Sequence, residues 1–149
     1  MAQPVRIYII ILLLTCSCIT SKISRTNEGI QGKVLWVEGN RMPAPNKTVD
    51  EGKPVIREIH IYKVLKLNDL DRTGSLFLAP QQKPVLVTKT NEFGEFKVNL
   101  ESGIYSILTK EKDGFFANSF DSENHVHPVK ITAGNFTNVK IIINYKAVY

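Results

Sequence analysis

The stretch 95–100, with the sequence EFKVNL, decides the fold class of this chain. Phe96, Val98 and Leu100 alternate with three polar residues, so an extended backbone would place all three apolar side chains on one face. A helix would distribute the same side chains around its axis, because its period is about 3.6 residues. We therefore predict a β-strand with one buried face over residues 95–100.

Further short runs rich in β-branched and aromatic residues lie on both sides of this strand. We expect strands over residues 29–37, 55–65, 84–90, 103–110, 126–132 and 137–145, separated by residues that favour turns. Directly before residue 95, Asn91 can bond its own backbone and Gly94 can adopt a positive φ, which predicts a hairpin. No stretch shows helical amphipathicity. The pattern predicts an all-β fold, a seven-stranded antiparallel Greek-key sandwich.

The first 18 residues have the features of a leader for export. Arg6 precedes an unbroken apolar run at residues 8–14, and small residues follow it, which is the order of a secretory signal peptide. The run is much shorter than the roughly 20 residues that span a bilayer as a helix. A buried first strand is the other interpretation, and it fits the extreme N-terminus less well. We expect a lipoprotein-type signal peptide at 1–17, a tether at 18–28 and one folded domain at 29–149.

Both cysteines of the chain lie at the end of this leader. Their surroundings resemble the lipobox of bacterial lipoproteins, in which a cysteine at the cleavage point is acylated. Cys18 follows a favourable Ser17 but has Thr15 where leucine is usual, whereas Cys16 has Leu13 in place but Thr15 at the cut. We favour Cys18 as the lipidated residue, with Cys16 as the alternative. The resemblance implies a lipid anchor in the bacterial cell envelope, which we expect to be in the outer membrane. Cleavage by ordinary signal peptidase would instead release the protein.

Five segments resemble, in order and spacing, the carboxypeptidase regulatory-like domain. They are GKV at 32–34, GNRMP at 39–43, TKTNEFGEF at 88–96, LESGIYSI at 100–107 and VKITAG at 129–134. The resemblance implies a prealbumin-like, or transthyretin-like, sandwich of the kind classed with carbohydrate-binding folds. Members are accessory modules on exported enzymes, receptors and surface lipoproteins, and catalysis in such enzymes belongs to a separate domain.

The resemblance covers residues 29–145 and departs from the family pattern at 44–54 and 66–83, where the family has short connections. Individual function is expected in such departures, because loops carry binding residues more often than strands do. We predict a binding or accessory module that presents the loops at 40–54, 66–83 and 113–126 to another envelope protein. The alternative is a carbohydrate-binding module that uses Phe77 and Phe120, two aromatic residues in predicted loops.

The composition argues against several other classes of function. The formal net charge is +5, and the lysines are scattered among acidic residues, which is typical of a solvated surface and not of a nucleic-acid interface. The sequence has no Gly-rich phosphate loop, no G-x-S-x-G elbow and no plausible acid pair. We therefore expect no catalytic residue and no cofactor.

Two patterns imitate metal sites. His125 and His127 would share one face of a strand, but no motif supplies the further ligands that a metal ion needs. The sequence at 69–74 resembles the beginning of a calcium loop, yet Pro80 stands where a bidentate glutamate should close it. We expect an ordinary strand start and an ordinary turn, and no metal.

A covalent cross-link is a further candidate that comes from the resemblance. Related adhesin repeats join a lysine of the first strand to an asparagine of the last, which here would be Lys33 with Asn138 or Asn144. That reaction also needs a buried acid between them, and the sequence alone does not identify one.

Overall fold

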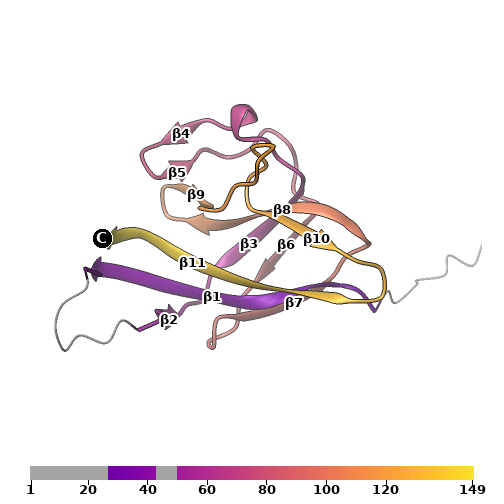
Figure 1. Ribbon diagram of the computed structural model, residues 1–149, viewed down its shortest axis with the longest axis horizontal. Coiled ribbons are helices and arrows are strands. Elements are labelled where there is room, and N and C mark those ends of the chain that lie inside the picture. Colours follow the sequence, from indigo (N-terminus) through magenta and orange to yellow (C-terminus); the bar gives the residue numbers. More distant parts are fainter. Residues whose placement is uncertain (1–26, 43–49) are drawn as a thin grey trace, which may run out of the picture.

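The computed structural model describes residues 27–42 and 50–149, and in these residues the fold is all-β (Figure 1). One turn of 3-10 helix, η1 (Leu67–Asp69), is the exception to this strand structure among the described residues. The prediction of an all-β fold is therefore confirmed. The predicted signal peptide, with Cys16 and Cys18, lies outside the described residues. None of the segments described is a helix of the length and apolarity that a membrane crossing requires.

The first sheet, here called sheet A, is organised around β1 (Gly29–Asn40). On one side β1 pairs in parallel with β11 (Phe136–Val148), the last strand of the chain. On its other side it pairs antiparallel with β7 (Glu95–Asn99) and, further along, with β2 (Lys53–Pro54). Sheet A is thus a long, narrow sheet with β1 at its centre (Figure 1).

The second sheet, sheet B, is antiparallel throughout and centres on β8 (Gly103–Glu111). One side of β8 carries β3 (Glu58–Lys63) and then β6 (Leu86–Lys89). The other side carries β10 (Pro128–Ile131) next to the first half of β8 and β9 (Gly114–Phe116) next to the second half. Beyond β9 follow β5 (Leu76–Phe77) and β4 (Arg72–Thr73).

The two sheets enclose one main hydrophobic core. Side chains from both sheets contribute to it, among them Ile30, Val34, Ile141 and Ile143 from sheet A and Ile59, Ile61, Tyr105 and Ile107 from sheet B. Burying one such side chain stabilises the fold by about 1.5–3 kcal/mol. The alternation predicted for residues 95–100 is confirmed, because Phe96 and Leu100 belong to this core and Val98 packs against it.

Asn91 and Gly94 form the predicted turn, but the turn is not a hairpin. Asn91 Oδ1 accepts hydrogen bonds from the backbone N–H groups of Phe93 and Glu95, at 3.0 and 2.8 Å. Gly94 has φ = +73°, and a Cβ there would lie 2.4 Å from the carbonyl oxygen of Val34. The strands on either side pair in different sheets, β6 with β3 and β7 with β1. The turn therefore carries the chain from sheet B to sheet A, which local turn chemistry cannot distinguish from a hairpin.

Glu28 fixes the beginning of β1 against two other turns of this kind. Its Oε1 accepts a hydrogen bond from the backbone N–H of Ser102 at 2.8 Å, and its Oε2 accepts one from Gly134 at 2.7 Å. The residue is buried, with 9% of its surface exposed. Glu28, the last residue of the predicted tether, thus makes hydrogen bonds to two turns of the β-domain.

The predicted connection at 66–83 contains structure of its own. η1, β4 and β5 lie in it, and the chain packs over the outer face of sheet B. Together with the segment after β9 it covers a second apolar cluster, made of Tyr62, Leu65, Phe77, Leu108, Phe115, Ala117 and Val126. Segment 66–83 thus has a packing role, which the prediction of a partner-facing loop did not include.

The described residues contain eleven strands, whereas the sequence predicted about seven. The additional strands are two or three residues long, too short to show an alternating pattern. The prediction of a fully antiparallel fold is also wrong at one place, the parallel pair β1 and β11. Alternation shows which side chains are buried, but it does not show which strands are neighbours.

A candidate binding groove on sheet A

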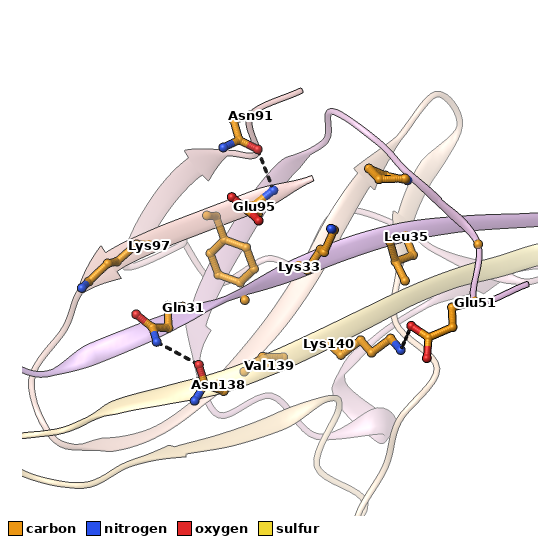
Figure 2. A pocket seen from close by; sticks show the side chains of 14 residues that line it. Gln31, Lys33, Leu35, Glu51, Asn91, Glu95, Lys97, Asn138, Val139 and Lys140 are labelled. Carbon is orange, nitrogen blue, oxygen red and sulfur yellow. Dashed lines mark hydrogen bonds and ion pairs between the residues drawn. The ribbon is translucent and has the colours of Figure 1, made fainter. Parts of the chain in front are cut away.

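An open groove of about 880 Å³ crosses the outer face of sheet A (Figure 2). Side chains of β1, β7 and β11 line it, and the segment just before β2 contributes Glu51 and Gly52. This face exists because β1 alternates. Ile30 and Val34 point into the main core, so Gln31 and Lys33 point to the other side.

Strand register arranges the groove side chains in rows across the sheet. Gln31 on β1 stands opposite Lys97 on β7 and Asn138 on β11. The Gln31 Nε2 amide donates a hydrogen bond to Asn138 Oδ1 at 2.9 Å, which fixes both amides (Figure 2). The Lys97 ammonium lies 4.0 Å from the centroid of the Phe136 ring. This row therefore combines an oriented amide pair with one cation.

The next row holds most of the charge. Lys33 at its centre stands opposite Glu95 on β7 and Lys140 on β11. Lys140 Nζ forms an ion pair with Glu51 Oε2 at 2.7 Å (Figure 2). Because the Lys140 ammonium donates this hydrogen bond, with a further contribution from the charge of Lys33, the pKa of Glu51 is held below its usual value. Lys33 itself forms no ion pair or hydrogen bond with a side chain in the part of the chain that the structure describes.

One end of the groove is closed by the chain before β2. Leu35 and Val37 continue the outward face of β1, yet they are buried. A Cβ on Gly52 would lie 2.7 Å from Val37 Cγ2 and 3.3 Å from Leu35 Cβ, so this glycine packs directly on them. Both faces of β1 are therefore covered in this half of the strand.

The two aromatic residues predicted to face a sugar occupy different environments. Phe77 is completely buried in the second apolar cluster, on the outer face of sheet B. Phe120 is 42% exposed, and its ring lies 6.5 Å from that of Phe77 in an edge contact. The prediction for Phe77 is therefore wrong, because the hairpin that contains it folds onto sheet B instead of projecting into water.

The histidines do not converge on one site. His125 Nδ1 lies 2.7 Å from Asp121 Oδ2, while His60 Nε2 lies 2.6 Å from Glu58 Oε1. His127 adopts a positive φ of 40° and is buried, and burial lowers the pKa of its imidazole. Residues 69–74 form the end of η1 and the beginning of a hairpin. Within the described ranges, no group of three or more His, Cys, Asp or Glu side chains is placed to hold a metal ion.

The cross-link candidates lie apart from Glu111, the more deeply buried of the two buried carboxylates among the described residues. Glu111, which the sequence did not identify, has 3% of its side chain exposed. Both of its oxygens accept hydrogen bonds from Arg57 Nε, at 3.1 and 3.3 Å, and Oε2 also accepts one from the Tyr145 hydroxyl at 3.1 Å. Burial, together with the negative charge of Glu111, raises the pKa of Tyr145 to about 12. Lys33 lies on the opposite face of β1, so this network joins the two sheets without it.

The sequence argument did not find the groove, because no motif marks it, and it named Lys33 and Asn138 only as cross-link candidates. The sequence did contain one signal, the polar residues at alternate positions of two strands. They are Gln31 and Lys33 in the first strand and Asn138 and Lys140 in the last. Only the parallel pairing of these strands brings the two sets together. Comparison with protein-family models, curated proteins and solved structures finds no match for the chain. The function has to be inferred from the residues and their geometry.

Proposed function

We propose that this protein is a non-catalytic lipoprotein of the bacterial cell envelope, whose β-domain binds an extended segment of another envelope protein. The observation that carries the proposal is the groove over β1, which is open and is lined by amides and charges from β1, β7 and β11. An extended peptide that followed β1 would meet a new row of side chains about every 6.6 Å, which is its own two-residue repeat.

The groove side chains suit reversible binding. The amide pair of Gln31 and Asn138 offers hydrogen-bond groups that are already oriented, so little side-chain freedom is lost when a ligand binds. The ammonium groups of Lys33 and Lys97 add charge at the solvent-exposed surface. Charge at such positions increases the association rate and the specificity more than the affinity.

The finer description of the fold is part of the proposal. We assign the domain to the prealbumin-like, Greek-key sandwiches and to the carboxypeptidase regulatory-like type. Support comes from the glycine turns at residues 91–94, 100–103 and 132–135, each of which carries the chain from one sheet to the other. These turns coincide with three of the segments that resemble the family in sequence.

The anchor is proposed at Cys18, with Cys16 as the alternative. Residues 19–26 extend over at most about 28 Å, at roughly 3.5 Å per residue, so the domain would remain near the membrane that holds the lipid. The carbohydrate-binding alternative is weakened by the burial of Phe77, because Phe77 and Phe120 cannot then form an exposed aromatic pair.

The binding proposal is tested with a photoactivatable amino acid at position 33 of the full chain, produced in bacteria that process lipoproteins and carry its envelope partners. We expect a cross-linked product of one discrete mass on irradiation. Position 89 on β6, whose lysine is exposed outside the groove, is the matched control and should give none. Equal cross-linking at both positions, or glycan binding that a substitution at Phe120 abolishes, would overturn the proposal.

The anchor is tested separately by substituting each cysteine with serine. Cys18→Ser should move the protein from the membrane fraction to the soluble fraction, and the mass of the mature N-terminus should lose the acyl groups. Cys16→Ser should leave both unchanged. If the two variants behave in the opposite way, Cys16 carries the lipid, and if neither releases the protein the anchor is wrong.

A further inference from the structure

The groove contains an arrangement of charge that points to the chemistry of its occupant. Lys33 and Lys140 are register partners on adjacent strands, so two positive charges stand side by side on the same face. Like charges directly opposite each other destabilise a sheet unless an anion lies between or above them. Two acidic groups are already present in this row, because Glu51 lies against Lys140 and Glu95 on β7 is the register partner of Lys33.

Among the described residues, Lys140 is the hydrogen-bond partner of the Glu51 side chain. The Glu51 side chain is 79% exposed, and it reaches the groove from the segment before β2, not from a groove strand. An ion pair this exposed contributes little to stability, because water and salt screen the attraction between its charges. A carboxylate from outside the molecule could therefore take its place at small cost to the fold.

The geometry points to an acidic peptide segment as the occupant of the groove, with one carboxylate taking the place of Glu51 at Lys33 and Lys140 and another, two residues away, at Lys97. This inference rests on the proposed function and names the chemistry of the partner. The spacing follows from the rows, because Lys97 stands in the row of Gln31, one two-residue step along β1 from the row of Lys33.

A peptide fits this arrangement better than an acidic polysaccharide does. The oriented amides of Gln31 and Asn138 match the donors and acceptors of a peptide backbone. The aromatic ring beside the amide row belongs to Phe136, the register partner of Gly29, and it is half-buried and already faces the Lys97 ammonium. A sugar ring would need a free aromatic platform at such a position.

The test uses the full chain in detergent and two labelled peptides, Thr-Glu-Thr-Glu-Thr and its counterpart with both Glu replaced by Gln, with fluorescence polarisation as the measurement. We expect the Glu peptide to bind at least tenfold more tightly than the Gln peptide, and its binding to weaken as salt is added. Lys33→Gln and Lys140→Gln should each weaken binding by about two- to fivefold, the range for one screened ion pair. Lys89→Gln, outside the groove, should change nothing.

Glu51 gives the sharpest readout. Glu51→Gln should tighten binding of the Glu peptide by about two- to fivefold, because it removes an internal competitor. Glu95→Gln is the matched control, since it removes the same charge from the same groove without touching the Lys140 ion pair, and it should have a smaller effect. Weaker binding by Glu51→Gln, equal binding of both peptides, or stronger competition by polygalacturonate or inorganic phosphate would each overturn the inference. If the peptides fail while cross-linking from position 33 persists, the occupant is not acidic and the proposed function stands.

Discussion

The outer faces of the two sheets differ in what covers them. On sheet B, the outward side chains of Tyr62, Leu108 and Phe115 are buried beneath the 66–83 segment and the chain after β9. On sheet A, the outward side chains of Gln31 and Lys33 face an open groove. The difference follows from the residue types at alternate positions, because large apolar side chains are stabilised by exclusion of water whereas amides and charges are not. The 66–83 segment therefore completes the fold on one side, and the candidate groove lies on the other.

If the 66–83 segment and the chain after β9, together called the cover of sheet B, are part of the folded core, Phe77→Ala should have the largest effect on stability. Phe77 is completely buried between the cover and sheet B, and truncation of such a side chain costs about 3–5 kcal/mol. Urea unfolding followed by circular dichroism measures the loss. Phe120→Ala, which removes a ring that is 42% exposed, should cost clearly less. A loss below about 1 kcal/mol for Phe77→Ala would mean that the cover is only loosely attached.

Loss of a buried hydrogen bond just before the 66–83 segment should have the next largest effect on the free energy of unfolding. Ser106 on β8 is completely buried, and its Oγ accepts a hydrogen bond from the backbone N–H of Leu65 at 2.9 Å. Ser106→Ala leaves that N–H without its partner, which costs about 1–3 kcal/mol in unfolding free energy. Ser75→Ala, in the exposed turn between β4 and β5, is the control and should be neutral. Equal stability of the two variants would contradict the burial of this contact.

Acid should destabilise the covered side of the molecule through His127. His127, which follows the chain segment that covers sheet B, is buried and has a pKa below the ordinary 6.5. Unfolding exposes the imidazole and lets it bind a proton more readily. The contribution of neutral His127 to the free energy of unfolding is therefore present above pH 6.5 and is lost as the pH falls below that value. His127→Asn, which tolerates the positive φ, should flatten the dependence of unfolding free energy on pH between 7.5 and 5. His60 and His125 are retained in both proteins, so their contributions cancel in the difference. Identical pH profiles would show that His127 is solvated.

The smallest effect is expected on the open side. Lys33→Gln should change the unfolding free energy by no more than about 0.5 kcal/mol, because the side chain lies in an open groove and forms no ion pair within the described residues. The same urea experiment measures it. A large loss would mean that Lys33 is needed for the fold, and its effect on a bound peptide could not then be interpreted as recognition.

Much of the sheet structure could be predicted from alternation, as the strands at 95–100 and 137–145 show, since burial on one face leaves a direct trace in the sequence. Asn91 and Gly94 likewise revealed their turn through local chemistry. The groove could not be predicted, because it depends on the pairing of the first and last strands, which lie more than 100 residues apart. Phe77 was misjudged for a related reason, since whether a polar loop packs back on a sheet is decided by residues far from it in the chain.

The two hydrogen bonds that the Glu28 carboxylate accepts have a mechanical consequence for the proposed lipoprotein. An anchor ahead of residue 27 would transmit tension into the domain at the beginning of β1, where the Glu28 carboxylate holds the turns at Ser102 and Gly134. Because β1 runs between β11 on one side and β7 and β2 on the other, a pull along its axis loads these ladders in shear, so many hydrogen bonds must break together. The strand that forms the floor of the groove is then also the strand that bears force between the membrane and the bound partner.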